Sequence, residues 1–164
     1  FKKLKQLLVF TFSTSSSNAS IPYTLDIVTR KYGVDKSFSS FSIPLGATIN
    51  MDGTAIMQGC ATYFLASYYG VTLEFTDYLT IIITATLASI GTAGIPSAGI
   101  IMLSIILEQI GIPLEGIALL LGVDRLLDMV RTSVNVAGDT CVTCIVAKSE
   151  DLINTEVFED TSES

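Results

Sequence analysis

The chain has 164 residues, of which 49% are hydrophobic and 15% are charged, and its mean hydropathy is +0.59. Soluble domains usually carry about 25% charged residues, so this composition favours a membrane protein. The net charge is −7, no basic cluster interleaved with aromatic residues is present, and histidine is absent. We therefore expect neither a nucleic-acid partner nor an enzyme that depends on a Ser–His pair or an H-E-x-x-H motif.

Four hydrophobic units follow one another along the chain. Residues 1–38 hold two apolar arms around STSSSNASIP, and each arm is too short to cross a bilayer, so we expect a re-entrant helical hairpin. Residues 39–73 are predicted to form a transmembrane helix broken at NMDGT. Residues 74–111 form a second predicted re-entrant hairpin around SIGTAGIPSAG, and residues 112–148 a second broken transmembrane helix.

The predicted fold is therefore an all-α membrane protein, with two re-entrant helical hairpins and two broken transmembrane helices in an inverted repeat. Basic residues flank the first hairpin and follow the last span: Lys2, Lys3, Lys5, Arg30, Lys31, Lys36 and Lys148. The positive-inside rule places these ends in the cytoplasm. The connections around Glu74 and Glu115 lack basic residues and are expected outside. Residues 149–164 form an acidic cytoplasmic tail, expected to be solvated and poorly ordered.

A polar stripe runs through the last unit. Its members are spaced by four, three, four and four residues, so they share one face of a helix: Asp124, Asp128, Arg131, Asn135 and Asp139. A charge at the bilayer centre costs about 2.5–3.5 kcal/mol, so this face must point toward protein, water or ions. The alternative is a purely structural pair of Asp128 and Arg131, but ionisable residues within membranes usually mark a functional site.

The segment GATINMDGT combines helix-weakening residues with an acid. An unwound turn would free the carbonyls of Gly46, Thr48 and Asn50, which with Asp52 and Asp139 suit a hard cation. In a soluble protein the same residues would indicate only a turn. Helix starts at the two hairpin tips could bind a carboxylate. Broken helices in an inverted repeat are typical of a transporter's substrate site.

The cysteines offer a weaker signal. Cys141 and Cys144 form a C-x-x-C pair, which can indicate metal or redox chemistry. Because they lie one turn apart among Val, Thr and Ile, we interpret them as small packing residues.

Four motifs together closely resemble the glutamate transporter family, the dicarboxylate/amino acid:cation symporters: SSSNASIP, NMDGT, SIGTAGIP and D-x-x-R-T-x-x-N-x-x-G-D. The resemblance covers about residues 6–150 and includes the inverted repeat known for that family. It implies sodium-coupled symport of aspartate or glutamate by alternating access. Alternatives on the same fold are C4-dicarboxylate symport, proton-coupled symport or an anion-conducting channel.

The resemblance also implies a substrate site. Arg131 would bind the side-chain carboxylate, Asp128 the α-amino group, and Ser17 with the first tip the α-carboxylate. The implied substrate ligands are Ser16, Ser17, Thr54, Gly94, Ile95, Gly99, Asp128, Arg131, Thr132 and Asn135.

Sodium is the only ion or cofactor that the resemblance implies. One site would use Asp139 with carbonyls of Gly46, Asn50 and Asn135. A second would use carbonyls of Thr48, Ser89, Ile90 and Thr92, and a third would use Asp52 and Asn50. The full set of implied ligands is Gly46, Thr48, Asn50, Met51, Asp52, Ser89, Ile90, Thr92, Asn135 and Asp139.

Four positions refine what the resemblance implies. Asp128 favours an amino acid over a C4-dicarboxylate, and Arg131 favours an acidic over a neutral amino acid. Gln58 stands where proton-coupled eukaryotic members carry Glu, so we expect coupling to sodium without that proton. Arg125 is predicted to reach the first tip, where some archaeal members place an Arg at the position of Ser15.

Members of that family also carry a preceding scaffold of six spanning segments that forms the trimer contact. We therefore expect these residues to be the transport-domain core of a multi-pass protein of the cell membrane. The expected partners are L-aspartate or L-glutamate, sodium ions, the lipid bilayer, the N-terminal scaffold and two further copies in a homotrimer.

Overall fold

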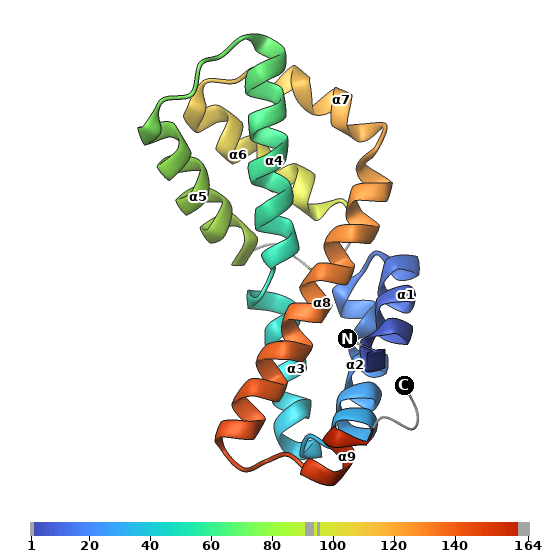
Figure 1. Cartoon of the computed structure of the whole chain (residues 1–164). Coiled ribbons are helices and arrows are strands. Elements are labelled where there is room, and N and C mark those ends of the chain that lie inside the picture. The colour runs from blue at the N-terminus through green and yellow to red at the C-terminus, as the bar shows by residue number, and fades with distance from the viewer. Residues whose placement is uncertain (1, 91–93, 95, 161–164) are drawn as a thin grey trace.

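The computed structural model describes residues 2–90, 94 and 96–160. Within these residues every regular element is a helix, apart from one antiparallel β-bridge between Val34 and Ile153. The all-α prediction is therefore confirmed. In chain order (Figure 1) the helices are η1 (Lys2–Leu4), α1 (Lys5–Thr14), α2 (Ser17–Tyr32), α3 (Lys36–Ile49), α4 (Asp52–Tyr69), α5 (Phe75–Ile90), α6 (Ala98–Ile110), η2 (Leu114–Gly116), α7 (Ile117–Leu121), α8 (Asp124–Ser149) and α9 (Thr155–Glu159).

Two of the interruptions between helices, those within the motifs SSSNASIP and NMDGT, are each only two residues long. Ser15 ends α1 with a φ of 50°, and its N–H donates to the carbonyl of Thr11. Ser16 then begins α2, because its hydroxyl accepts a 3.2 Å hydrogen bond from the N–H of Ala19. The second interruption, at residues 50–51, separates α3 from α4 within NMDGT.

The fourth hydrophobic unit differs from the expected one. The chain is interrupted at residues 122–123, between α7 and α8, and α8 runs without a break through the whole polar stripe. The polar side chains of the stripe find partners either within α8, as Arg131 does with Asp128, or on other segments, as Asn135 and Asp139 do, so α8 does not need to unwind to satisfy them.

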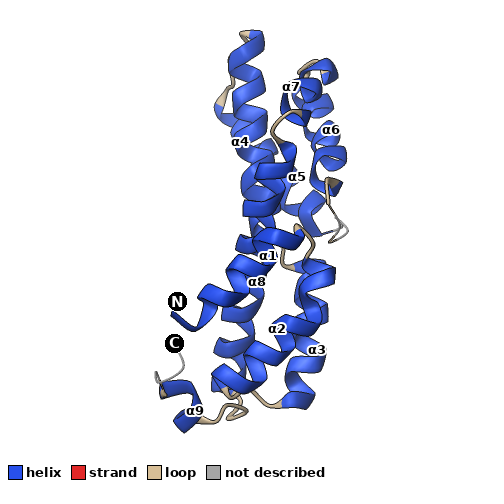
Figure 2. Cartoon of the chain, turned by 90° about the vertical axis from the view of Figure 1, so that its right-hand side faces the viewer, coloured by secondary structure: helices blue, strands red, loops and turns tan. Residues whose placement is uncertain are grey.

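Two helix pairs occupy opposite ends of an elongated molecule (Figures 1 and 2). The α1–α2 pair packs against α8 near both termini, with α3 beside α2, and the α5–α6 pair packs against α4 at the other end. Helix α8 contacts α1, α2, α3 and α4, so it links the two ends. The largest apolar cluster joins α4, α5 and α6 around Leu65, Leu103 and Leu107.

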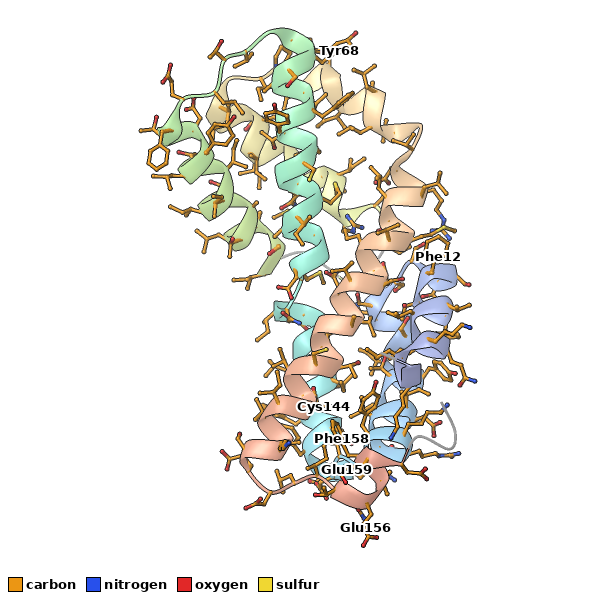
Figure 3. The ribbon with its side chains drawn as sticks, viewed as in Figure 1. Phe12, Tyr68, Cys144, Glu156, Phe158 and Glu159 are labelled. Atoms are coloured by element: carbon orange, nitrogen blue, oxygen red, sulfur yellow. The ribbon has the colours of Figure 1, made fainter. Side chains whose placement is uncertain are left out.

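The acidic C-terminal segment is mostly exposed, as expected of a solvated segment, and it carries the short helix α9. The N–H of Asp35 donates to the carbonyl of Leu152, and the N–H of Asn154 to that of Gly33, each over 2.8 Å. Figure 3 labels Phe158 on α9, close to the end of α2 and far from Tyr68.

Among the described residues, none of the helices combines the length and the apolar content that a bilayer crossing would require.

Candidate functional site

The polar stripe of α8 faces the interior of the protein. Each of its five side chains is at most 5% exposed, and Thr132 beside them is 3% exposed. On the opposite side of the helix Leu126 and Val130 are 63% and 54% exposed. This arrangement confirms that the stripe does not face the surroundings, and it inverts the usual pattern of polar surface and apolar core.

Asp128 and Arg131 form an ion pair in which both side chains are buried. The backbone N–H of Ser97 donates a 2.9 Å hydrogen bond to the second oxygen of Asp128. Arg131 Nη1 has no hydrogen-bond partner among the described residues. Gly99, in the first turn of α6, lies so close to this guanidinium that a Cβ at Gly99 would overlap it.

The ends of the two helix pairs meet at Gly94, three residues before the Ser97 that contacts Asp128. The hydroxyl of Ser16 donates to the carbonyl of Gly94 over 2.8 Å, and the N–H of Asn18 donates to the same carbonyl over 3.3 Å. Ser17, the first residue of α2, is buried. Ile95, another predicted ligand, lies outside the described residues. Residues about 80 positions apart in sequence therefore border one site.

Asn135 joins the middle of α8 to the start of α4. Its Oδ1 accepts a 2.8 Å hydrogen bond from the N–H of Gly53, and its Nδ2 donates to Thr54 Oγ1 over 3.3 Å and to Met51 Sδ over 3.6 Å. Three predicted site residues, Met51, Thr54 and Asn135, are thus in direct contact one turn beyond Arg131.

A second polar cluster lies at the interruption between α3 and α4. Asn50 Nδ2 donates to Asp139 Oδ1 over 2.9 Å. A Cβ built at Gly46 would lie 2.6 Å from the same oxygen, and one at Gly138 would lie 2.9 Å from Asp52 Oδ2. Four predicted sodium ligands, Gly46, Asn50, Asp52 and Asp139, therefore surround one spot, although Asp52 itself is exposed.

The ligands of the second predicted sodium site, Thr48, Ser89 and Ile90, make no hydrogen bond with one another in the described part of the chain. The hydroxyl of Thr48 donates to the carbonyl of Pro44, and that of Ser89 to the carbonyl of Thr86, each within its own helix. Ile90 is 44% exposed, and Thr92 lies outside the described residues. Nor do the described Cys, Asp and Glu side chains form a group of three that could hold a metal.

Two predictions about individual side chains are wrong. Arg125 is exposed and makes no hydrogen bond or ion pair with a described residue, because one residue step on a helix turns its side chain by about 100° from Asp124. The packing role predicted for the cysteines is wrong for Cys141, which is exposed, whereas Cys144 is half-buried and packs against the apolar cluster around Val28 and Ile43.

The sequence did not predict the contacts of two residues near the site, Ser97 and Gln58. Ser97 contacts both Asp124 and Asp128, and the only sequence signal for it is a Ser that precedes the apolar run of α6. Gln58 is fully buried and donates to the carbonyl of Gly99 over 3.3 Å, which links α4 to α6 beside Arg131.

Together, the described residues form an all-α protein in which a cluster of buried charges lies at converging helix ends. Residues 1–149 match the sodium:dicarboxylate symporter family, and the chain belongs to this family. The resemblance found in the motifs is thereby confirmed.

The relatives within the family are named as transporters of excitatory amino acids or of neutral amino acids. The chain is 44% identical over 166 residues to excitatory amino acid transporter 2 of Homo sapiens, which covers 98% of the chain and 29% of that protein. It is 44% identical over 136 residues to an excitatory amino acid transporter of Caenorhabditis elegans (83% and 27%). It is 47% identical over 132 residues to neutral amino acid transporter B(0) of Mus musculus (80% and 24%). The chain thus spans less than a third of the length of these relatives.

Proposed function

We propose that the protein is a sodium-coupled symporter that moves aspartate or glutamate across a membrane by alternating access. The observation that carries this proposal is the buried Asp128–Arg131 ion pair, placed where the ends of the α1–α2 and α5–α6 pairs meet. A buried ion pair contributes little to stability compared with apolar packing, so a role in binding explains its presence better than a role in folding.

The charges of this pair match those of an acidic amino acid. Asp128 would bind the ligand's ammonium group, and the planar guanidinium of Arg131 would bind the side-chain carboxylate through two parallel hydrogen bonds. Ligand binding would exchange one internal ion pair for two ion pairs with the ligand. The unpartnered Nη1 of Arg131 supports this exchange, because a buried donor without an acceptor is costly.

The start of α2 supplies a place for the ligand's α-carboxylate. α2 has 16 residues, and the free N–H groups and dipole at the start of a helix attract anions. Ser16 and Ser17 lie at this start, beside Gly94 of the other helix pair. Thr132 and Asn135, buried on the same face of α8 as Arg131, would complete the polar lining.

The cluster at the α3–α4 interruption is the proposed main sodium site. The predicted unwinding at Gly46 and Thr48 is not seen, because both residues lie inside α3. A carboxylate, an amide side chain and carbonyls at the end of α3 are nevertheless oxygen ligands of the kind that hard cations prefer. Gly46 leaves space beside Asp139 that any side chain would fill. Sodium bound there would neutralise Asp139, and the second and third sets of predicted ligands would bind further ions.

Several features support a membrane location. The buried polar stripe contrasts with exposed apolar side chains on other helices. Four of these side chains on α5 and α6 are 59–71% exposed: Ile82, Ile83, Leu87 and Ile101. Large exposed apolar surfaces mark contacts with protein or lipid. We propose that the two helix pairs are re-entrant hairpins, that α3–α4 and α7–α8 are broken spans in an inverted repeat, and that a preceding scaffold provides the homotrimer contacts.

Transport of radiolabelled L-aspartate into proteoliposomes tests the proposal. The full-length protein that contains this chain should accumulate aspartate only with an inward sodium gradient. Arg131→Ala should abolish aspartate uptake, and Asp128→Ala should abolish uptake of every amino acid, whereas Arg125→Ala should leave uptake unchanged. Retained aspartate uptake in both of the first two variants would overturn the assignment. Preferred uptake of succinate, or a proton-driven or purely conductive flux, would favour one of the alternatives on this fold.

A further inference from the structure

Ser97, the residue before α6, contacts two carboxylates of α8 through two different atoms. Its hydroxyl donates to Asp124 Oδ2 over 2.6 Å, and its backbone N–H donates to Asp128 Oδ2 over 2.9 Å. Asp124 and Asp128 lie one turn apart on the polar stripe. A single residue of the α5–α6 pair therefore bridges both acids, although only Asp128 has a part in the proposed function.

The conformation of Ser97 directs its polar groups toward α8. A serine before a helix usually accepts a hydrogen bond from the first turn of that helix. Ser97 makes no such cap, and its φ of 62° lies in the left-handed region that most residues avoid. Both its hydroxyl and its N–H are used on α8 instead, so this residue stabilises the contact between α6 and α8 rather than α6 alone.

Asp124 depends strongly on this contact. It is the first residue of α8 and is 5% exposed. The Ser97 hydroxyl is its side-chain hydrogen-bond partner, and Asp124 Oδ1 has none among the described residues. Hydrogen bonds to a carboxylate are stronger than those between neutral groups. A buried carboxylate that loses its hydrogen-bond donor therefore destabilises the folded protein.

We propose that Asp124 is a positioning residue for substrate binding. Through the Ser97 hydroxyl it holds the start of α6 against α8, and it thereby keeps the Ser97 N–H on Asp128. This inference rests on the proposed function, in which Asp128 binds the substrate's ammonium group. Asp124 does not itself touch the substrate, so its loss shortens the time that an amino acid stays bound without changing which amino acid is preferred.

Two substitutions at Ser97 separate the hydroxyl contact from the backbone conformation. Glycine and asparagine both tolerate a positive φ, but only asparagine keeps a side-chain donor for Asp124. In the full-length protein with sodium, Ser97→Gly should raise the dissociation rate of labelled aspartate about tenfold, the loss expected for one charge-assisted hydrogen bond. Ser97→Asn should stay within about twofold of the native rate, and the control Ser104→Ala, whose hydroxyl donates only within α6, should be unchanged.

Asp124→Ala completes the test as a double-variant cycle. If the two residues act through one contact, the double variant Ser97→Gly/Asp124→Ala should release aspartate at the same rate as the more severe of the two single variants. Additive effects, equal behaviour of Ser97→Gly and Ser97→Asn, or an altered order of preference among aspartate, glutamate and alanine would each overturn the proposal. The Ser97 variants decide the matter even if Asp124→Ala fails to fold.

A measurement without substrate keeps the two proposals distinguishable. Amide hydrogen exchange over residues 98–103 should become faster in Ser97→Gly but not in Ser97→Asn. If the native protein fails to bind aspartate, the proposed function is overturned, while the exchange comparison still decides whether Asp124 holds α6. Unchanged exchange in Ser97→Gly would contradict the contact itself.

Discussion

The side-chain amide of Asn50 donates a 2.9 Å hydrogen bond to Asp139 Oδ1, which ties the interruption between α3 and α4 to the middle of α8. This contact explains why α8 can carry an acid at mid-helix without unwinding. It also gathers the groups of the proposed main sodium site, since Gly46 lies against the same carboxylate oxygen.

Gly46→Ala should weaken sodium binding. The added Cβ would lie 2.6 Å from Asp139 Oδ1, so the carboxylate must move away from the carbonyls with which it is proposed to share the ion. Overpacking of this kind usually costs about 1–3 kcal/mol, so we expect the sodium concentration for half-maximal aspartate uptake to rise about fivefold or more.

The matched control for this prediction is Gly59→Ala. Gly59 lies in α4, and a Cβ there would meet nothing within 4 Å. Its sodium dependence should equal that of the native protein. Equal sodium dependence of Gly46→Ala and the native protein would contradict a sodium site at Asp139.

Gly99→Ala should impair binding of acidic amino acids. A Cβ at Gly99 would overlap the guanidinium of Arg131, so Arg131 must leave the position from which it would bind the side-chain carboxylate. Calorimetry with L-aspartate in sodium should show an affinity at least about tenfold lower than native. Gly122→Ala, where a Cβ would meet nothing within 4 Å, should bind normally. Normal aspartate affinity in Gly99→Ala would argue against Arg131 as the carboxylate ligand.

The sequence predicted the helical class and the buried face of α8 because both depend on short-range periodicity. Residues at spacings of three and four share one helix face whatever the rest of the fold does. The energetic cost of charge in an apolar setting then fixes which way that face points. The contacts of Asn135 with Thr54 and Met51 follow from the same face, but the partner residues could be suggested only through the family resemblance.

Two features of the fold were not predicted. The first is the short gap between α1 and α2, where one capping hydroxyl, a contact within a single helical turn, allows α2 to begin at Ser17 and to include Pro22. The second is the packing of residues 150–160, whose acidic composition favours disorder. It depends on apolar contacts of Ile153 and on Lys3, which lies about 150 residues away in sequence.

Lys3→Met should loosen the C-terminal segment. Lys3 Nζ donates to the carbonyls of Lys31, Val157 and Phe158 over 2.7–2.9 Å, so it joins the ends of α2 and α9. Methionine keeps the apolar stem but provides no donor, and we expect faster amide exchange across residues 152–159. Lys5→Met, at an exposed position, is the control and should show native exchange. Protection that persists in Lys3→Met would mean that the apolar contacts alone order this segment.

Gly33→Ala should detach the same segment by a different route. Gly33 has a φ of 69°, and a Cβ there would lie 2.8 Å from the carbonyl oxygen of Asn154. This backbone oxygen cannot move away without disturbing the adjacent β-bridge between Val34 and Ile153. Gly70 has the same φ but open space around it, so Gly70→Ala measures the cost of the backbone conformation alone, about 1 kcal/mol. In detergent, Gly33→Ala should therefore lower the midpoint of thermal unfolding more than Gly70→Ala does, and it should expose residues 152–159 to limited proteolysis. If both variants lose the same stability and both keep the segment protected, the close approach of α9 to the end of α2 does not contribute to the fold.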